Sequence, residues 1–422
     1  MKRSPRLDRY AQFVGEDMLA RIYHVAESLA GVHVLHINTT RHGGGVAELL
    51  AALLPLMEEL GIPHTWNVIT LADAENRFVA RLGEMLQGIG QGGLSTQEQR
   101  VFLDSLQHTV SESYVQEKQA DFYFIHDFQL APLATFLPWM RPALWMCHVD
   151  TAHPNASAKA YIEQFLDPYV VYVFNTQASI FPELPHDKTQ VITPTIDPFG
   201  EKNRDIAQAY GLKLLSDCGI DTTRPLITQV SRFSTWKNPW QVIDVYRLVK
   251  QQLPTVQVAL VGAMEAADDI SAQEILKQLQ DYAGKDTDIH LLSDPAQIQH
   301  VQVNAFQRYS SVILQRSPRE GFGLTATEAM WKYQPVVGTS ATGLRTQILD
   351  GQNGYIVDDT ETCAQDTLKL LQDRDLWHQL GKAAHQRVQD NYLLPTMALE
   401  YLTALTKARD NGRETAKVSP IS

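Results

Sequence analysis

The 422-residue sequence has little cysteine, no long apolar run and no excess of basic residues. Its three cysteines, Cys147, Cys218 and Cys363, lie far apart and form no CxxC pair, which argues against a disulfide framework or a zinc site. No apolar stretch reaches the roughly 18 residues of a membrane-spanning helix. The first residues are basic but lack the apolar core of a signal peptide. We therefore expect a cytoplasmic protein without a bound metal.

Basic residues are outnumbered, since the formal net charge is −12 at pH 7. Proteins that bind nucleic acid or anionic membranes present a basic face, so neither is an expected partner. With 44% hydrophobic and 20% charged residues, the composition is typical of a globular protein. A chain of 422 residues is too long for one ordinary core, which predicts at least two domains.

The first half of the chain alternates apolar runs with helical patterns. The runs that fit buried strands are residues 32–38, 64–69, 121–126, 144–149 and 171–175. Apolar residues between 46 and 57 recur at helical spacing, directly after a run of glycines. Alternation of this kind predicts a mostly parallel sheet covered by helices on both faces.

The same pattern restarts after about residue 197. Candidate strands follow at residues 226–230, 256–261, 289–292, 311–315, 335–338 and 354–357, and the tail reads as helices. The fold class is therefore α/β with two Rossmann-like domains. We assign residues 1–197 to the first domain and residues 198–390 to the second, with a C-terminal helix at about 391–412 packing back on the first.

Ligands of open parallel sheets bind beyond the carboxyl ends of the strands, so the loops there are the expected places for binding and catalytic residues. Gly43, Gly44 and Gly45 follow the strand at 32–38 and precede a helix, where backbone amides and the helix N-terminus favour an anion. A tight turn is the alternative. Arg232 and Lys237 follow the strand at 226–230 and would hold a diphosphate, unless they are ordinary surface charges.

A third loop, after the strand at 311–315, carries two carboxylates in the string EGFGLTATE. Glu320 lies in the loop, and Glu328 lies one turn into the following helix. A helix start favours anionic groups, so this loop suits phosphates. The Glu328 carboxylate would accept ribose hydroxyls, and Glu320 would face a sugar.

The string from Glu320 to Glu328 resembles the E-x7-E signature of the family 4 retaining glycosyltransferases of the two-domain GT-B type. The strings GGGVAELL, CHVD, VSRF and REGFGL resemble, more specifically, the trehalose synthases that join a nucleotide-glucose to free glucose. The resemblance implies two Rossmann-like domains that face each other across a cleft. It also implies retention of the α configuration with no required cofactor.

The resemblance assigns the donor side mainly to the second half of the chain. It implies that Arg232 and Lys237 neutralise the diphosphate, that Glu320 contacts the donor sugar and that Glu328 binds the ribose. The residues that would approach the donor through their backbone are Gly44, Gly45, Gly321, Phe322, Gly323 and Leu324.

The resemblance places the acceptor in the first half. His148 and Asp150 would reach the transferred sugar or the acceptor, and with Arg232, Lys237 and Glu320 they form the expected catalytic set. The remaining acceptor candidates are His126, Asp127, Gln129 and Asn155, of which Asn155 could equally serve the loop structure. The strand histidines His33, His36 and His64 are interpreted as packing or hydrogen-bonded core residues.

Four positions depart from the trehalose synthase pattern. Residues 83–88 lack an expected His and Asn, Met146 stands in place of an Arg, and no proline follows Asp127. Thr342, Gly343 and Leu344 replace a GG-I turn. Because most departures lie in the first half, they concern the acceptor more than the donor.

The expected reaction is transfer of glucose from UDP-glucose or ADP-glucose to glucose, giving trehalose. Synthesis of a glycerate, glycerol or fructose derivative is an open alternative, as is a non-catalytic nucleotide-sugar-binding protein. A phosphorylase-like or epimerase activity would use the same fold. The sequence leaves open the nucleobase, the donor hexose, stimulation by Mg²⁺ and a homodimer.

Overall fold

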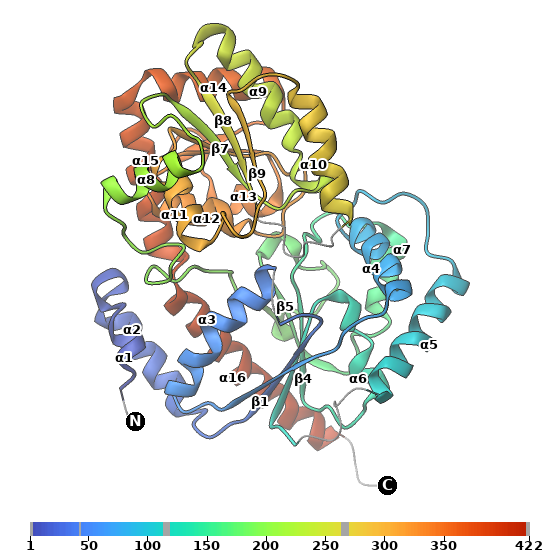
Figure 1. Cartoon of the computed structure of the whole chain (residues 1–422). Coiled ribbons are helices and arrows are strands. Elements are labelled where there is room, and N and C mark those ends of the chain that lie inside the picture. The colour runs from blue at the N-terminus through green and yellow to red at the C-terminus, as the bar shows by residue number, and fades with distance from the viewer. Residues whose placement is uncertain (1–2, 42–43, 113–118, 263–269, 419–422) are drawn as a thin grey trace. The chain divides into compact units, whose positions relative to one another are not determined.

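The computed structural model describes residues 3–41, 44–112, 119–262 and 270–418. The chain forms two compact units. Unit 1 comprises Met1–Thr195 and Leu394–Ser422, and unit 2 comprises Ile196–Leu393. Each unit contains one six-stranded sheet flanked by helices (Figure 1). The α/β class expected from the sequence is therefore confirmed.

The sheet of unit 1 is parallel throughout, with the strand order β2-β1-β3-β4-β5-β6. Every residue of β1, β3, β4 and β5 is buried, because helices cover both faces of the sheet. The strands are β1 Val34–Asn38, β2 His64–Val68, β3 Phe122–His126, β4 Ala143–Cys147, β5 Tyr169–Phe174 and β6 Thr189–Val191.

The helices of unit 1 come mainly from the first half of the chain, but one is the last helix of the protein. Helix α16 packs against α2, α3 and β5, so residues far apart in the sequence share one core (Figure 1). The helices are α1 Pro5–Asp8, α2 Ala11–Glu27, α3 Gly45–Glu59, α4 Asp73–Leu86, α5 Thr96–Glu112, α6 Leu133–Phe136, α7 Ala156–Glu163 and α16 Leu394–Val418.

The sheet of unit 2 is also parallel, with the strand order β12-β11-β10-β7-β8-β9. Its strands are β7 Leu226–Val230, β8 Gln257–Val261, β9 Ile289–Leu292, β10 Val312–Gln315, β11 Val336–Gly338 and β12 Gly354–Ile356. Its helices are α8 Gln208–Asp217, α9 Pro239–Gln252, α10 Ile270–Ala283, α11 His300–Tyr309, α12 Leu324–Trp331, α13 Thr342–Gln347, α14 Thr360–Gln372 and α15 Arg374–Asn391.

Each sheet has one point where the strand order reverses. In unit 1 the chain passes from β1 to β2 on one side and from β3 to β4 on the other. In unit 2 it passes from β7 to β8 on one side and from β10 to β11 on the other. Ligands of such sheets bind beside the carboxyl ends of the two diverging strands. The loops after β1, β3, β7 and β10 are therefore the first places to look for a site.

The apolar runs of the sequence each overlap a strand of the structure. Strand β6 was missed because Thr189–Val191 is short and has a polar residue at its centre. Helix α16 extends to Val418, beyond the predicted end near residue 412. Among the described residues no helix is both long and apolar enough to cross a bilayer.

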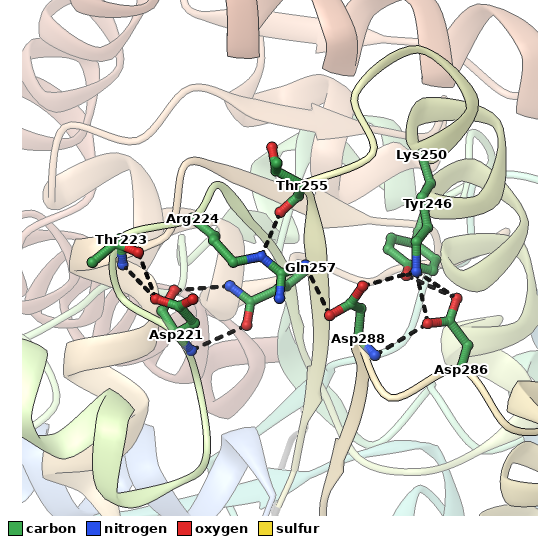
Figure 2. A network of polar contacts seen from close by, with 9 residues as sticks. All are labelled: Asp221, Thr223, Arg224, Tyr246, Lys250, Thr255, Gln257, Asp286 and Asp288. Carbon is green, nitrogen blue, oxygen red and sulfur yellow. Dashed lines mark hydrogen bonds and ion pairs between the residues drawn. The ribbon is translucent and has the colours of Figure 1, made fainter.

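The amino ends of β7, β8 and β9 are joined by a polar network (Figure 2). Lys250, on α9, donates to Asp286 at 2.7 Å and to Asp288 at 2.9 Å, and Arg224 lies 2.8 Å from Asp288. Desolvation favours a raised pKa for both aspartates. The hydrogen bonds from Lys250 and from the other neighbours, together with the attraction of the nearby cations, outweigh it, so both pKa values lie below their ordinary range. The network stabilises the sheet at the edge opposite the loops that follow its strands.

Replacing Lys250 with Met should test this network, because the change removes the cation but keeps most of the apolar stem. We expect urea denaturation at pH 7 to show a loss of about 1–3 kcal/mol in the free energy of unfolding. Both aspartates have lowered pKa values in the folded state, so their stabilisation is present above an ordinary pKa of about 4 and fades as the pH falls through the folded values. The difference between the two proteins should therefore shrink below about pH 4.

Lys213 is the matched control, because it pairs with Asp217 at 2.5 Å while both side chains stay mostly exposed. Lys213→Met should cost no more than about 0.5 kcal/mol. Equal losses in the two variants would show that the Lys250 network adds nothing beyond a surface ion pair.

Candidate functional site

The loops after β7 and β10 bring the predicted cation and carboxylate of unit 2 together. Lys237 ends a short helical turn, Thr235–Lys237, and its amine lies 2.5 Å from the Glu320 carboxylate. The two side chains are 23% and 16% exposed, so the pair is shielded but reachable. Spacing alone had placed these residues in separate loops. The strand order makes them neighbours.

The loop after β7 starts from a tightly packed backbone. A Cβ atom on Gly262, at the end of β8, would lie 1.9 Å from the Ser231 carbonyl oxygen. Only glycine fits there, and this contact fixes the chain directly before Arg232. The Arg232 side chain is exposed beyond it. The loop thus presents two cations, the exposed Arg232 and the more shielded Lys237.

Arg316 anchors the loop after β10, and sequence reasoning missed its role. The side chain is fully buried. Its guanidinium donates to the carbonyl oxygens of Val357 at 2.6 Å and Asp358 at 2.8 Å, beyond β12. A buried arginine needs such partners, and here they tie two loops of the same sheet edge. The local signal was an arginine directly after an apolar strand.

The glycine-rich turn before α12 is held by backbone contacts. Gly323 begins the helix in a left-handed conformation, with φ of 90°. The Gly343 amide donates to the Glu320 carbonyl at 2.9 Å, and the Gln347 side chain donates to the Phe322 carbonyl at 2.5 Å. The Phe322 ring is buried against Tyr392, with centroids 5.5 Å apart. Phe322 therefore offers only its backbone to a ligand.

The neighbours Gly321, Gly323 and Leu324 are partly exposed at this turn, consistent with a site for backbone contacts. Thr342, which stands where the trehalose synthase pattern has a glycine, has little consequence here, because the position that must be glycine is Gly343. A Cβ on Gly343 would lie 2.3–2.5 Å from Phe322 backbone atoms.

Glu328 is buried on α12 within a polar cluster. Its carboxylate accepts a hydrogen bond from Gln307 at 2.7 Å, and the Lys202 amine lies 4.0 Å away. The amine of Lys332, one turn later, donates to Gln307, Asn203 and the Glu328 carbonyl. Burial lowers the pKa of Lys332 to about 7. The hydrogen bond from Gln307 orients the Glu328 carboxylate. Its contact with a ribose stays a prediction.

In unit 1, the loop after β1 contains the glycine run. Gly44 caps α3 with φ of 78° and Gly45 is the first helical residue, while His42 and Gly43 lie outside the described residues. Before the glycines, Arg41 donates to the Trp66 carbonyl at 2.8 Å and lies over the Trp66 ring. The loop thus delivers a helix N-terminus to the edge where the strand order reverses.

Asp127 follows β3 in a conformation that is uncommon outside glycine, with φ of 73°. Its carboxylate accepts from the amides of Phe128 at 3.1 Å and His148 at 3.4 Å. Desolvation raises its pKa to about 6. Asp127 therefore connects the loop after β3 to the end of β4, and a strained residue at such a junction is typical of functional sites.

Three buried oxygens at this edge have no hydrogen-bond partner among the described residues. They are Oδ2 of Asp150, Oε1 of Gln129 and Oδ1 of Asn175, which follow β4, β3 and β5. A buried acceptor is costly unless a donor satisfies it, so these atoms suit a ligand rich in hydroxyl groups. Sequence reasoning missed Asn175, although it is the first polar residue after the apolar strand β5.

The other acceptor candidates have different surroundings. His148 is partly exposed at the end of β4 and makes a ring contact of 3.1 Å to the buried His126. Asn155 caps α7, since its Oδ1 accepts from the Ser157 and Ala158 amides and its Nδ2 donates to the Gly92 carbonyl. The structure therefore shows a loop role for Asn155, and its acceptor contact stays a prediction.

Residues 83–88, which differ from the trehalose synthase pattern, pack against the loops that carry the acceptor candidates. The Asn155 amide donates to the Met85 carbonyl at 2.8 Å, and a Cβ on Gly88 would lie 2.2 Å from the His153 carbonyl oxygen. A Cβ on Gly83 would touch the Phe128 ring at 3.0 Å. The segment that differs from the trehalose synthase pattern thus shapes the loops on which the acceptor candidates sit.

Replacing Gly343 with Ala should displace the turn at residues 320–323, because no room exists for the added methyl group. We expect a loss of about 1–3 kcal/mol in stability and faster hydrogen exchange of the amides in that turn. Gly412→Ala is the control, since its Cβ would meet only Pro142 at 3.4 Å within a helix. Unchanged melting and exchange in the Gly343 variant would contradict the packing described here.

Comparison with known proteins agrees with this geometry. Residues 36–180 match the family model described as trehalose synthase, N-terminal domain, and residues 214–387 match the glycosyl transferases group 1 model. The trehalose synthase of Thermococcus litoralis is 38% identical over 95% of this chain and 96% of its own length. That of Rubrobacter xylanophilus is 33% identical over 94% and 96%.

Solved structures support the fold. An α,α-trehalose-phosphate synthase (UDP-forming) from Burkholderia vietnamiensis aligns with a TM-score of 0.71 over 92% of this chain and 99% of its own, at 14% identity. The GT-B class and the resemblance drawn from the sequence are both confirmed. The chain is a glycosyltransferase and belongs to the trehalose synthase family.

Proposed function

We propose that this glycosyltransferase moves glucose from UDP-glucose or ADP-glucose to free glucose, giving trehalose with the α configuration retained. The observation that carries the proposal is the Lys237–Glu320 pair at the reversal of strand order in unit 2. Its position is the one where sheets of this class bind nucleotides. The full-length similarity to trehalose synthases supports the sugar assignment.

On the donor side, negative charge develops on the departing diphosphate as the bond to the sugar breaks. Lys237 and Arg232 supply positive charge, and the backbone amides at the start of α12 supply hydrogen-bond donors. Groups that are already oriented stabilise such charge at little reorganisation cost. The ion pair holds the Lys237 amine in place before the donor arrives, and Glu320 is then available to the sugar hydroxyls.

On the acceptor side, a hexose offers several hydroxyl donors and few other groups. The unsatisfied oxygens of Asp150, Gln129 and Asn175 match that chemistry, and His148 adds an imidazole beside them. In the proposed retaining reaction, the departing phosphate accepts the proton of the attacking acceptor hydroxyl on the same face of the sugar. No protein carboxylate is then needed as a covalent nucleophile.

A product assay tests the proposal directly. Purified protein is incubated with UDP-, ADP- or GDP-glucose, with and without free glucose and with and without Mg²⁺. We expect a non-reducing disaccharide with α,α linkage, formed only when glucose is present, as read by mass and proton NMR. Transfer to glycerol, glycerate or fructose instead would leave the transferase assignment in place and would attribute the changed acceptor to residues 83–88 and Met146.

The proposed role of Lys237 predicts how Lys237→Ala changes the kinetics of glycosyl transfer. Because the amine is proposed to stabilise charge that develops during bond breaking, kcat should fall by about 10²–10³-fold while the donor KM changes much less. Initial rates at varied donor concentration separate the two parameters.

Lys213→Ala, which removes an exposed cation of the same unit, should leave both parameters unchanged. A rise in donor KM at constant kcat in the Lys237 variant would mean that Lys237 binds the ground state only, and the proposed role would be abandoned.

A further inference from the structure

Four histidines and one tyrosine form a continuous chain across the sheet of unit 1. His36 Nδ1 lies 2.9 Å from His126 Nε2, and His126 Nδ1 lies 3.1 Å from His148 Nε2. The Tyr401 hydroxyl, on α16, lies 2.9 Å from His36 Nε2 and 3.0 Å from His64 Nε2. The chain therefore begins on β2, crosses β1 and β3 and ends at the candidate site after β4.

The rings are oriented for hydrogen bonding through their edges. The planes of His36 and His126 differ by 18°, and those of His126 and His148 differ by 24°. The ring of Tyr401 lies within 23° of the plane of His36. Since the N–H bond and the nitrogen lone pair of imidazole lie in the ring plane, near-coplanar rings at these distances make N–H···N hydrogen bonds.

Desolvation favours the neutral form of all four imidazoles. It lowers the pKa of His148 to about 3 and that of His64 to about 4, and it holds the pKa values of His36 and His126 well below their ordinary range. A neutral imidazole carries one donor and one acceptor nitrogen. Each ring that donates on one side must therefore accept on the other.

This rule couples the tautomers along the chain. If His36 donates from Nδ1, His126 accepts at Nε2 and donates from Nδ1, and His148 then carries its proton on Nδ1. If the direction is reversed, all three rings carry the proton on Nε2. In either case His36, His126 and His148 share one tautomer. The Tyr401 hydroxyl stands at the head of this series, because its single proton goes either to His36 or to His64.

Apolar side chains surround the chain and limit other partners for the rings. A cavity of about 20 Å³ beside His36, His126 and His148 is lined by Val46, Leu49, Leu53, Met146, Ile192 and Met397. This volume is enough for about one water molecule, and most of the lining is apolar. The buried His36 and His126 use both of their ring nitrogens within the chain.

We propose that Tyr401 is a positioning residue that acts through His36 and His126 to hold His148 in a single tautomer. The free Nδ1 of His148 then has one defined character, donor or acceptor, toward the sugar at the end of β4. The catalytic part of this inference rests on the proposed function, because it takes His148 to contact substrate. The shared tautomer follows from the hydrogen bonds alone.

Nitrogen-15 NMR of the histidine rings in the full chain tests the inference without any substrate. We expect His36, His126 and His148 to show the same single tautomer in the unmodified protein. In Tyr401→Phe, His148 should become a mixture of both tautomers. Opposite tautomers in the unmodified protein, or an unchanged His148 in the variant, would overturn the proposal.

Tyr169→Phe is the matched control for the loss of a buried hydroxyl. Tyr169 is fully buried in the same unit, and its hydroxyl donates to the Ala131 carbonyl at 2.8 Å, away from the histidines. This variant should keep the His148 tautomer. A mixture here would show that general loosening of unit 1, and not the hydroxyl of Tyr401, changes the ring.

Kinetics then test the link to the reaction. Tyr401→Phe and His36→Phe should each lower kcat by roughly tenfold with little change in donor KM, in proportion to the loss of one hydrogen bond. The double variant should be no slower than the single variants, because both act through the same chain. Additive losses would refute transmission through His36. If the tautomers behave as expected but no sugar is transferred, the proposed function fails and the coupled chain stands.

Discussion

Strands β7 and β10 are neighbours in the sheet of unit 2, and the chain leaves them in opposite directions along that sheet. The loops after these strands cannot follow the same path, so their side chains meet at the carboxyl edge. The Lys237–Glu320 pair is the direct product of this divergence. The same reversal between β1 and β3 brings the glycine run and Asp127 to one edge of unit 1. The candidate residues of each unit, taken separately, therefore follow from the same rule of parallel-sheet topology.

The amino ends of β7 to β9 in unit 2 and the carboxyl edge of the unit 1 sheet differ in how their polar groups are satisfied. At the amino edge of unit 2, Lys250 and Arg224 satisfy the aspartates around them, which suits a role in stability (Figure 2). At the carboxyl edge of unit 1, oxygens of Asp150 and Asn175 are buried without a partner in the described part of the chain. A fold keeps such atoms only where something else offsets their cost. The satisfied network stabilises its sheet, whereas the unpartnered oxygens are available to a ligand.

Local sequence pattern was sufficient for most of the strands, because fully buried parallel strands are continuous apolar runs. It also located Lys237 and Glu320 in the loops after two such runs, while their roles stay predictions. It was insufficient for Arg316, whose partners lie beyond β12, and for Gln347, which holds the turn at Phe322 from another helix. The interpretation of His36 as a packing or hydrogen-bonded core residue agrees with its burial and its two ring contacts. The sequence did not show that these contacts continue from His64 to His148, because only the pairing of the strands brings the histidines together.

The histidine chain also gives a physical meaning to the departure at position 146. Met146 is 4% exposed and lines the cavity beside His148. An arginine buried there would need a carboxylate or several acceptors of its own, and its N–H groups would compete for the lone pairs of the neighbouring rings. Methionine offers no such donor, so the ring nitrogens are left to bond to one another. The C-terminal helix does more than pack against the sheet, because it supplies the Tyr401 hydroxyl that joins His64 to His36, 365 positions away from His36 in the sequence.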